Sequence, residues 1–303
     1  MLGGRERGLI TYTAPMLALD HRPQVEAVHK VGEAGMLEAR NASKTFGGIQ
    51  ALLGVSLTVT EGTIAGLIGP NGSGKTTLLN CLSGVVKLTT GSITLDGGDA
   101  NGWAPERFAR AGVVRTFQNI RLFSQLTALQ NVEVCALAAS GLSRAAAREL
   151  AMLLLADLGL DGLAERHAVT LSYGDQRRVE IARALAARPR FLLLDEPAAG
   201  MNEAESDALA ETLARIRDRL ECGVLIVEHN LRVVMGLCER VYVLNEGRLI
   251  SDGSADDVRR DAAVIAAYIG SPRQPRAARL DSDPRERESP ASMQGKSPES
   301  KKE

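Results

Sequence analysis

A glycine-rich loop between an apolar run and a helical pattern constrains this chain more than any other feature. The run TIAGLIG (63–69) predicts a buried strand, GPNGSGKTT (69–77) follows it, and TTLLNCLSG (76–84) predicts a helix closed by Gly84. The loop fits the pattern G-x-x-x-x-G-K-[ST], and it lies directly after a strand and before a helix. An ordinary glycine-rich turn is the alternative, but it does not account for both flanking elements. The sequence therefore predicts a phosphate-binding loop.

The residue types in this loop suit the binding of a nucleotide triphosphate. Backbone amides of residues 72–76 can surround the phosphates, and the helix N-terminus adds its partial positive charge. Lys75 can reach the β- and γ-phosphates, and the Thr76 hydroxyl can bind Mg²⁺. The candidate nucleotide-binding residues of the loop are Asn71, Gly72, Ser73, Gly74, Lys75, Thr76 and Thr77.

A second motif, FLLLDEP (191–197), places two adjacent carboxylates at the end of an apolar run. The run predicts a buried strand, and the carboxyl ends of such strands are where ligands of open α/β sheets bind. Asp195 suits the Mg²⁺ shell, directly or through a water, and Glu196 could polarise the water that attacks the γ-phosphate. Taken alone, the pair is also compatible with a helix cap beside a surface charge.

Strand and helix patterns alternate along the rest of the chain. GVSLTVTEG (54–62) alternates apolar and polar residues as a half-buried antiparallel strand does. Residues 120–172 predict a mostly helical insertion with breakers near Gly141 and Gly159. From Asp175 onward helices and strands alternate, which favours a parallel sheet covered by helices. The predicted fold class is α/β.

Composition limits the classes of partner. The net charge of −1 gives no global basic field, so nucleic acid is not an expected partner. No apolar run approaches the roughly 18 residues of a membrane span.

The sequence predicts one folded domain, at residues 36–272, between two disordered segments. Residues 1–35 form the N-terminal disordered segment, and residues 273–303 form a disordered tail rich in Pro, Ser and charge. The four cysteines have no metal-site spacing, and we expect them to be reduced thiols in the core.

The order of the motifs resembles that of ABC-type ATPases, the nucleotide-binding subunits of ABC transporters. RTFQN (115–119), LSYGDQRR (171–178), LLLDEP (192–197) and VEH (227–229) follow the phosphate loop in that family's order, over about residues 36–270. The resemblance implies a P-loop ATPase with a mainly parallel sheet core, an antiparallel β subdomain and a helical subdomain, and it implies ATP and Mg²⁺ as cofactors.

The resemblance also implies roles for single residues. Gln118 matches the glutamine that senses Mg²⁺ and the attacking water, so it joins Thr76 and Asp195 in the expected metal shell. His229 matches the histidine at the γ-phosphate, and Phe46 in SKTFGG matches the aromatic residue that stacks on adenine. From the residues alone, three alternatives remain open: Gln118 as an ordinary turn residue, His229 as a structural residue and Phe46 as a core residue.

In this family two ATPase subunits pack head to tail, and the signature of one closes over the ATP of the other. Ser172 and Gly174, before a helix expected to begin near Asp175, would therefore serve the partner's nucleotide. A helix N-cap at Ser172 or Asp175 is the alternative. The signature has Tyr173 where Gly is commoner, and Asn202 stands where many relatives have Asp, so contacts across the dimer are expected to differ.

Several segments, DEPAAGMN (195–202) among them, look most like the ATP-binding subunits of branched-chain amino acid importers. This likeness implies a peripheral ATPase on the cytoplasmic face of the plasma membrane. Its expected partners are two membrane-spanning permease subunits, a second ABC ATPase subunit, identical or homologous, and indirectly an extracytoplasmic solute-binding protein. The alternatives are the ATPase of an exporter of lipid or glycolipid and a non-transport ABC ATPase.

Overall fold

The strands form two sheets in the computed structural model, which describes residues 34–269. The smaller sheet is antiparallel, in the order β2-β1-β4-β5, with bounds Ile49–Thr60 (β2), Met36–Phe46 (β1), Thr90–Leu95 (β4) and Gly98–Asp99 (β5). The larger sheet has the order β10-β9-β3-β8-β7-β6, with bounds Arg248–Gly253, Arg240–Asn245, Ile64–Ile68, Gly223–Val227, Phe191–Asp195 and Val113–Arg115. Its strands from β9 to β6 pair in parallel, and β10 is antiparallel to β9.

The central strands of the larger sheet are apolar along their length because both of their faces are covered. In β7, Phe191 and Leu193 belong to one hydrophobic core, whereas Leu192 and Leu194 belong to another. Residues 224–227 of β8 alternate between the same two cores. Successive side chains of a strand point to opposite faces, so a strand buried on both sides needs an unbroken apolar run.

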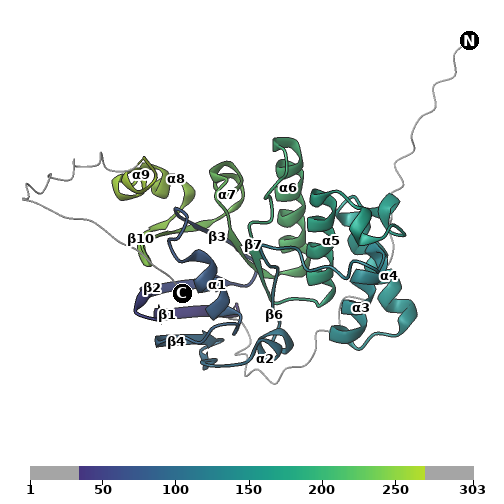
Figure 1. Cartoon of the computed structure of the whole chain (residues 1–303), viewed down its shortest axis with the longest axis horizontal. Coiled ribbons are helices and arrows are strands. Elements are labelled where there is room, and N and C mark those ends of the chain that lie inside the picture. Colours follow the sequence, from purple (N-terminus) through teal and green to yellow (C-terminus); the bar gives the residue numbers. More distant parts are fainter. Residues whose placement is uncertain (1–33, 270–303) are drawn as a thin grey trace, which may run out of the picture. The chain divides into compact units, whose positions relative to one another are not determined.

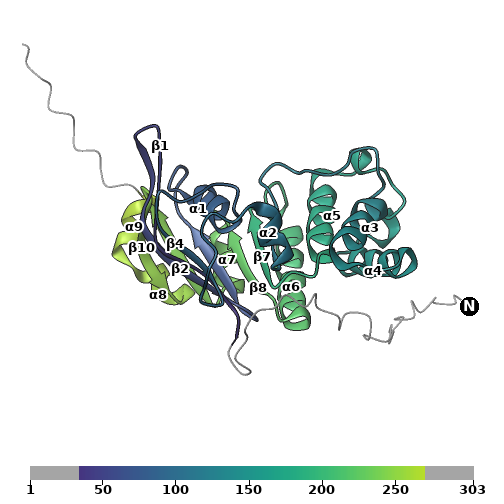
Figure 2. The ribbon, with the colours of Figure 1, turned by 90° about the horizontal axis from the view of Figure 1, so that it is seen from below.

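The two cores lie on opposite faces of the larger sheet. On one face the sheet packs against α1 (Lys75–Leu82) and the antiparallel sheet, and on the other it packs against the later helices (Figures 1 and 2). Helices α3, α4 and α5 also pack on one another as a helical unit. The remaining helices are α2 (Pro105–Arg110), α3 (Ala128–Ser140), α4 (Arg144–Asp157), α5 (Tyr173–Ala186), α6 (Glu203–Leu220), α7 (Leu231–Leu237), α8 (Ala255–Arg260) and α9 (Ala262–Ile269).

The predicted fold class is confirmed: a mainly parallel sheet carries helices and a separate antiparallel sheet. The signature helix, expected to begin near Asp175, starts within two residues of that position. It begins at Tyr173, because the Ser172 hydroxyl accepts a hydrogen bond from the Asp175 amide and caps the helix two residues earlier. The region 120–172 holds α3 and α4, and Gly141 caps α3 in a left-handed conformation with φ of 60°.

Several short or terminal elements were absent from the sequence prediction: strands β1, β5, β6 and β10 and helices α2, α8 and α9. Strand β2 begins before the alternating run that starts at Gly54. The predicted segments 1–35 and 273–303 fall almost wholly outside the described residues. Within residues 34–269, no helix combines the length and apolar character needed to span a bilayer. Three cysteines are buried as expected and Cys135 is half-buried, and all four are free thiols.

Candidate functional site

The phosphate loop runs from Gly69 to Thr77, between β3 and α1, and it depends on close backbone approaches. A Cβ on Gly69 would lie 2.0 Å from the Leu244 carbonyl oxygen, and one on Gly74 would lie 2.6 Å from that of Ala51. Both glycines have positive φ, 150° and 106°. Only glycine fits these positions, so neighbouring backbone from β9 and β2 fixes the shape of the loop.

The start of α1 is suited to bind an anion. Its N-cap is Gly74, which supplies no side-chain hydrogen bond, and its first turn contains no acidic residue. The backbone amides at this end therefore have no side-chain cap and are available to a phosphate, together with the positive end of the helix dipole.

The Lys75 side chain is buried in the loop. Its ammonium donates to the carbonyl oxygens of Gly69 at 2.8 Å and Pro70 at 3.0 Å. Burial lowers the pKa of Lys75, while the charges of Glu196 and Asp195 raise it. The Lys75 ammonium is therefore partly shielded from water and interacts electrostatically with both carboxylates.

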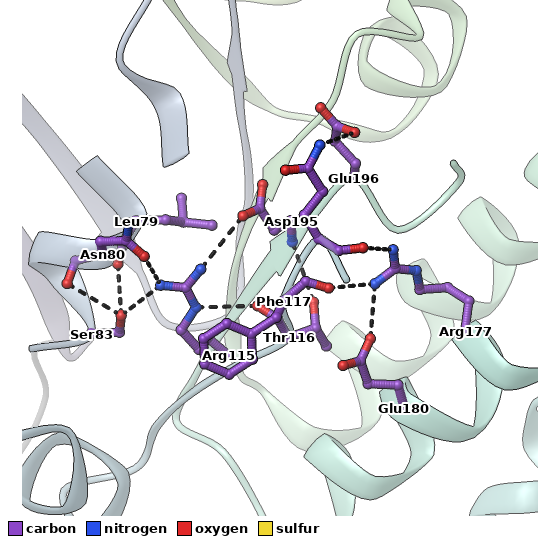
Figure 3. A network of polar contacts seen from close by, with 11 residues as sticks. Leu79, Asn80, Ser83, Arg115, Thr116, Phe117, Arg177, Glu180, Asp195 and Glu196 are labelled. Atoms are coloured by element: carbon purple, nitrogen blue, oxygen red, sulfur yellow. Dashed lines mark hydrogen bonds and ion pairs between the residues drawn. The ribbon is translucent and has the colours of Figure 1, made fainter. Parts of the chain in front are cut away.

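Asp195 ends β7 and is 1 % exposed. Its Oδ2 lies 3.4 Å from Arg115 Nη2, and its backbone amide donates to the Thr116 hydroxyl at 3.3 Å (Figure 3). Arg115 in turn donates to Asn80 Oδ1 at 2.6 Å and the Ser83 hydroxyl at 3.0 Å, both on or next to α1. Burial raises the pKa of Asp195, and Arg115 lowers it. The ion pair therefore ties the end of β7 to the helix that follows the phosphate loop.

Glu196 is the meeting point of three loops. It has a left-handed φ of 51°, and its amide donates to the Val227 carbonyl at 2.9 Å. Its Oε2 accepts a hydrogen bond from Gln118 Nε2 at 3.3 Å, and its Oε1 lies 3.9 Å from His229 Nδ1. The structure thus brings together Gln118, Glu196 and His229, which follow β6, β7 and β8.

The residues present fit Mg²⁺ bound together with a nucleotide. Asp195 Oδ1 is buried without a hydrogen-bond partner, and the Thr76 hydroxyl is exposed on the first turn of α1. No group of three His, Cys, Asp or Glu within residues 34–269 could hold a metal ion by itself. Mg²⁺ binds few protein oxygens and completes its octahedral shell with water and phosphate. One carboxylate oxygen and one hydroxyl match that requirement.

The signature turn lies away from the phosphate loop of the same chain. β7 lies between α1 and α5 in both ribbon views (Figures 1 and 2). Ser172 caps α5, as one alternative predicted, and its hydroxyl also contacts the Asp175 carboxylate at 2.8 Å. Tyr173 is exposed and packs against Gly200, on which a Cβ would lie 3.0 Å from the ring. Asn202 caps α6 in a capping box with Glu205, so this side chain has a structural role within the chain.

Phe46 is not a core residue. Its side chain is 45 % exposed at the end of β1, with the Lys44 ammonium 4.8 Å from the ring centroid. None of the hydrogen bonds or ring contacts found for the described residues joins Phe46 to the phosphate loop. An exposed ring is available for stacking, and a ring in the core would not be.

Sequence reasoning did not find Glu228, which is 1 % exposed. Its carboxylate accepts from the amides of Ala198 at 2.8 Å and His229 at 3.2 Å. Burial raises the pKa of Glu228, whereas the hydrogen bonds from the backbone amides of Ala198, Asn230 and His229 lower it. Glu228 therefore links the segment after Glu196 to the segment that carries His229. An acidic residue directly after an apolar run was the available signal.

Arg177 and Glu180 on α5 were also missed. They form a buried ion pair at 2.8 Å, with exposures of 0 % and 2 %. Two charged residues three positions apart on a helix are ordinarily a surface pair, so the sequence alone favoured exposure.

Comparison with known proteins agrees with this geometry. The family model described as ABC transporter matches residues 52–199, and that described as branched-chain amino acid ATP-binding cassette transporter matches residues 248–273. A high-affinity branched-chain amino acid transport ATP-binding protein of Pseudomonas aeruginosa is 41% identical over 249 residues, covering 78% of this chain and 98% of that protein. A lipopolysaccharide export system ATP-binding protein of Escherichia coli (strain K12) is 36% identical over 234 residues, with coverages of 77% and 97%.

Solved structures show the same fold. A crystal structure of the ADP conformation of an ATP-binding cassette of an ABC transporter matches with a TM-score of 0.70 and 31% identity, covering 78% of this chain and 99% of that one. A dimeric post-hydrolysis cassette bound to ADP and Pi matches with a TM-score of 0.67 and 28% identity, with coverages of 72% and 98%. The chain belongs to the ATP-binding proteins of ABC transporters.

Proposed function

We propose that this chain binds and hydrolyses ATP to drive the import of branched-chain amino acids or related solutes. The meeting of Gln118, Glu196 and His229 beside the phosphate loop carries the catalytic part of the proposal. The match of residues 248–273 to the branched-chain amino acid cassette model carries the transport part.

In the proposed reaction the phosphate loop holds the triphosphate. The amides of residues 72–76 donate to the phosphate oxygens, and Lys75 exchanges its donation to Gly69 and Pro70 for the β- and γ-phosphates. The exposed Phe46 ring stacks on the adenine. Binding therefore replaces the contacts of the Lys75 ammonium with neutral carbonyl oxygens by contacts with negatively charged phosphate oxygens.

Glu196 is the proposed general base, since it directly follows β7 and its side chain is 21 % exposed, so water can reach the carboxylate. Gln118 and His229 flank it on two sides, so a water held there would contact both the carboxylate and the γ-phosphate. Thr76, Gln118 and Asp195 are the proposed ligands of Mg²⁺, which would neutralise charge that develops on the phosphate oxygens. The chain supplies the orientation of the water and the electrostatic environment.

The complete site is proposed to need a second ABC ATPase subunit. The Ser172–Gly174 turn has donors that its own phosphate loop does not use, and two cassettes packed head to tail would present them to the partner's γ-phosphate. One solved relative, a post-hydrolysis cassette bound to ADP and Pi, is dimeric.

The remaining partners follow from the transport function. We place the chain on the cytoplasmic face of the plasma membrane, bound peripherally to two permease subunits that receive solute from an extracytoplasmic binding protein. The test is reconstitution of the chain with its permeases in proteoliposomes, followed by measurement of leucine uptake. ATP-dependent uptake that Glu196→Gln abolishes is the expected result.

A lipid exporter is the second candidate, because a lipopolysaccharide export ATP-binding protein is 36% identical to this chain. The same proteoliposomes separate the two functions. ATP-dependent extraction of lipopolysaccharide from the membrane, with no leucine uptake, would show that the chain serves an exporter and would refute the proposed import function.

A further inference from the structure

Arg177 joins the signature helix to the backbone of the Gln118 loop. Its Nη1 donates to the Phe117 carbonyl at 2.6 Å, and its Nη2 donates to the Gln118 carbonyl at 2.6 Å (Figure 3). The guanidinium therefore spans two consecutive carbonyl groups, and one of them belongs to the residue whose side chain contacts Glu196.

The anchor is rigid because Arg177 is itself held on several sides. Its Nη1 also donates to Glu180 at 2.8 Å, and its Nη2 donates to the Tyr173 hydroxyl at 3.2 Å. Glu180 in addition accepts from the Arg121 amide at 3.3 Å. Arg177 is 0 % exposed, so water does not compete for these donors.

The pairing suits positioning better than simple stabilisation. A buried ion pair is a poor source of stability, because desolvation of both charges offsets their attraction. A planar guanidinium, however, can hold two carbonyls in one fixed geometry, which a lysine ammonium cannot do. The loop segment from Phe117 to Arg121 is thereby fixed to α5 at both ends.

We infer that Arg177 is a positioning residue. By holding the Phe117 and Gln118 backbone carbonyls from the signature helix, it orients the side-chain amide of Gln118 toward the Glu196 carboxylate. The inference rests on the proposed ATPase function, in which Gln118 acts on the attacking water and the Mg²⁺ shell. It also gives a physical link between the turn at Tyr173, proposed to face the partner's nucleotide, and the chain's own Gln118.

Two variants of the full-length chain test this. Arg177→Lys keeps the charge that faces Glu180 but loses the two-carbonyl geometry. The double variant Arg177→Met/Glu180→Leu removes both members of the buried pair, so neither remains as an unpaired charge. Arg183, 4.0 Å from Glu180, keeps its hydrogen bond to the Arg121 carbonyl. In both, kcat for ATP is expected to fall about 10- to 100-fold while KM changes less than about threefold, since small displacements of a catalytic group have effects of this size.

A second measurement does not depend on catalysis. Amide hydrogen exchange of residues 116–121 in the nucleotide-free chain is expected to speed up about tenfold or more in both variants, because the loop loses its anchor. Arg190→Lys is the matched control. Arg190 is also a partly buried guanidinium, but it forms ion pairs with Glu61 and Asp96 and does not contact the Gln118 loop. This variant should lower the melting temperature without changing kcat or the exchange of this segment.

The outcomes separate cleanly. Unchanged exchange and kcat in both Arg177 variants, or an equal fall of kcat in Arg190→Lys, would overturn the positioning role. A wild-type chain that hydrolyses no ATP with its partners would refute the proposed function instead, and exchange would still decide whether Arg177 anchors the loop.

Discussion

Gln118 donates a 3.3 Å hydrogen bond to the Glu196 carboxylate, although the two residues lie 78 positions apart. Glu196 has a φ of 51°, a conformation that costs about 1–3 kcal/mol for a residue other than glycine. The hydrogen bond from its amide to Val227, in the neighbouring strand, holds this conformation. Strain of this kind is concentrated at functional sites, where it fixes the direction of a side chain.

Glu196→Gln should retain ATP binding and lose turnover. The amide is nearly the same size as the carboxylate and cannot accept a proton, so single-turnover hydrolysis is expected to fall by about 10²- to 10⁴-fold. Nucleotide titration should give a Kd within a few-fold of wild type. Glu203→Gln, at an exposed residue on α6, is the control and should leave both values unchanged. Undiminished hydrolysis in Glu196→Gln would remove Glu196 from its role.

Lys75→Ala should weaken nucleotide binding itself. The variant loses one charge-assisted hydrogen-bond donor, worth about 1.5–3 kcal/mol, so the Kd for ATP should rise about 10- to 100-fold. Fluorescence titration with a labelled ATP analogue measures this. Lys87→Ala, at an exposed lysine beyond α1, is the matched control and should bind normally. An unaltered Kd in Lys75→Ala would contradict the predicted contact with the phosphates.

Two glycines of the phosphate loop should differ in their tolerance of alanine. At Gly69 a Cβ would lie 2.0 Å from the Leu244 carbonyl oxygen, whereas at Gly72, with φ of 79°, it would meet nothing within 4 Å. Gly72→Ala should therefore cost only the conformational strain, about 1–2 kcal/mol of unfolding free energy. Gly69→Ala should cost more and abolish nucleotide binding. Denaturant unfolding of the two variants checks the order, and equal losses would show that the loop adjusts.

Glu228 should make stability depend on pH. Burial raises the pKa of its carboxyl, so between the ordinary value of 4.5 and the raised value the folded chain retains a proton that the unfolded chain has lost. The contribution of Glu228 to the free energy of unfolding therefore falls as pH rises through this interval, by up to about 1.4 kcal/mol per pH unit, and is constant above it.

Glu228→Gln does not titrate and isolates this effect. The free energy of unfolding of the variant minus that of wild type should increase as the pH rises from about 4.5. Urea unfolding at a series of pH values measures the difference. A difference that is flat or decreases with pH would show that the hydrogen bonds from Ala198 and His229 outweigh burial.

The buried thiols should resist alkylation. Burial raises the pKa of Cys238 to about 12 and that of Cys81 to about 11. At pH 8 less than about one thiol in a thousand would be ionised at either site, and only the thiolate reacts. Iodoacetamide should label half-buried Cys135 first in the native chain and all four cysteines after unfolding. Rapid labelling of native Cys238 would indicate local opening near α7.

The sequence determined the parts of this protein that depend on local patterns. Unbroken apolar runs identified β3 and β7, because a strand covered on both faces has no place for a polar side chain. The glycines of the phosphate loop identified the loop, because neighbouring backbone leaves no room for a Cβ at Gly69 and Gly74. The order of the motifs then indicated the family.

Only the tertiary structure decided which side chains meet. Arg177 and Glu180 follow a spacing that is usual on a helix surface, yet the Gln118 loop covers them completely. Glu228 is a single acidic residue beside His229, and one of its partners, the Ala198 amide, comes from the loop after β7. Local sequence carries little information about such contacts, because hydrogen bonds between segments far apart in the chain form only when the sheet places the ends of its parallel strands side by side.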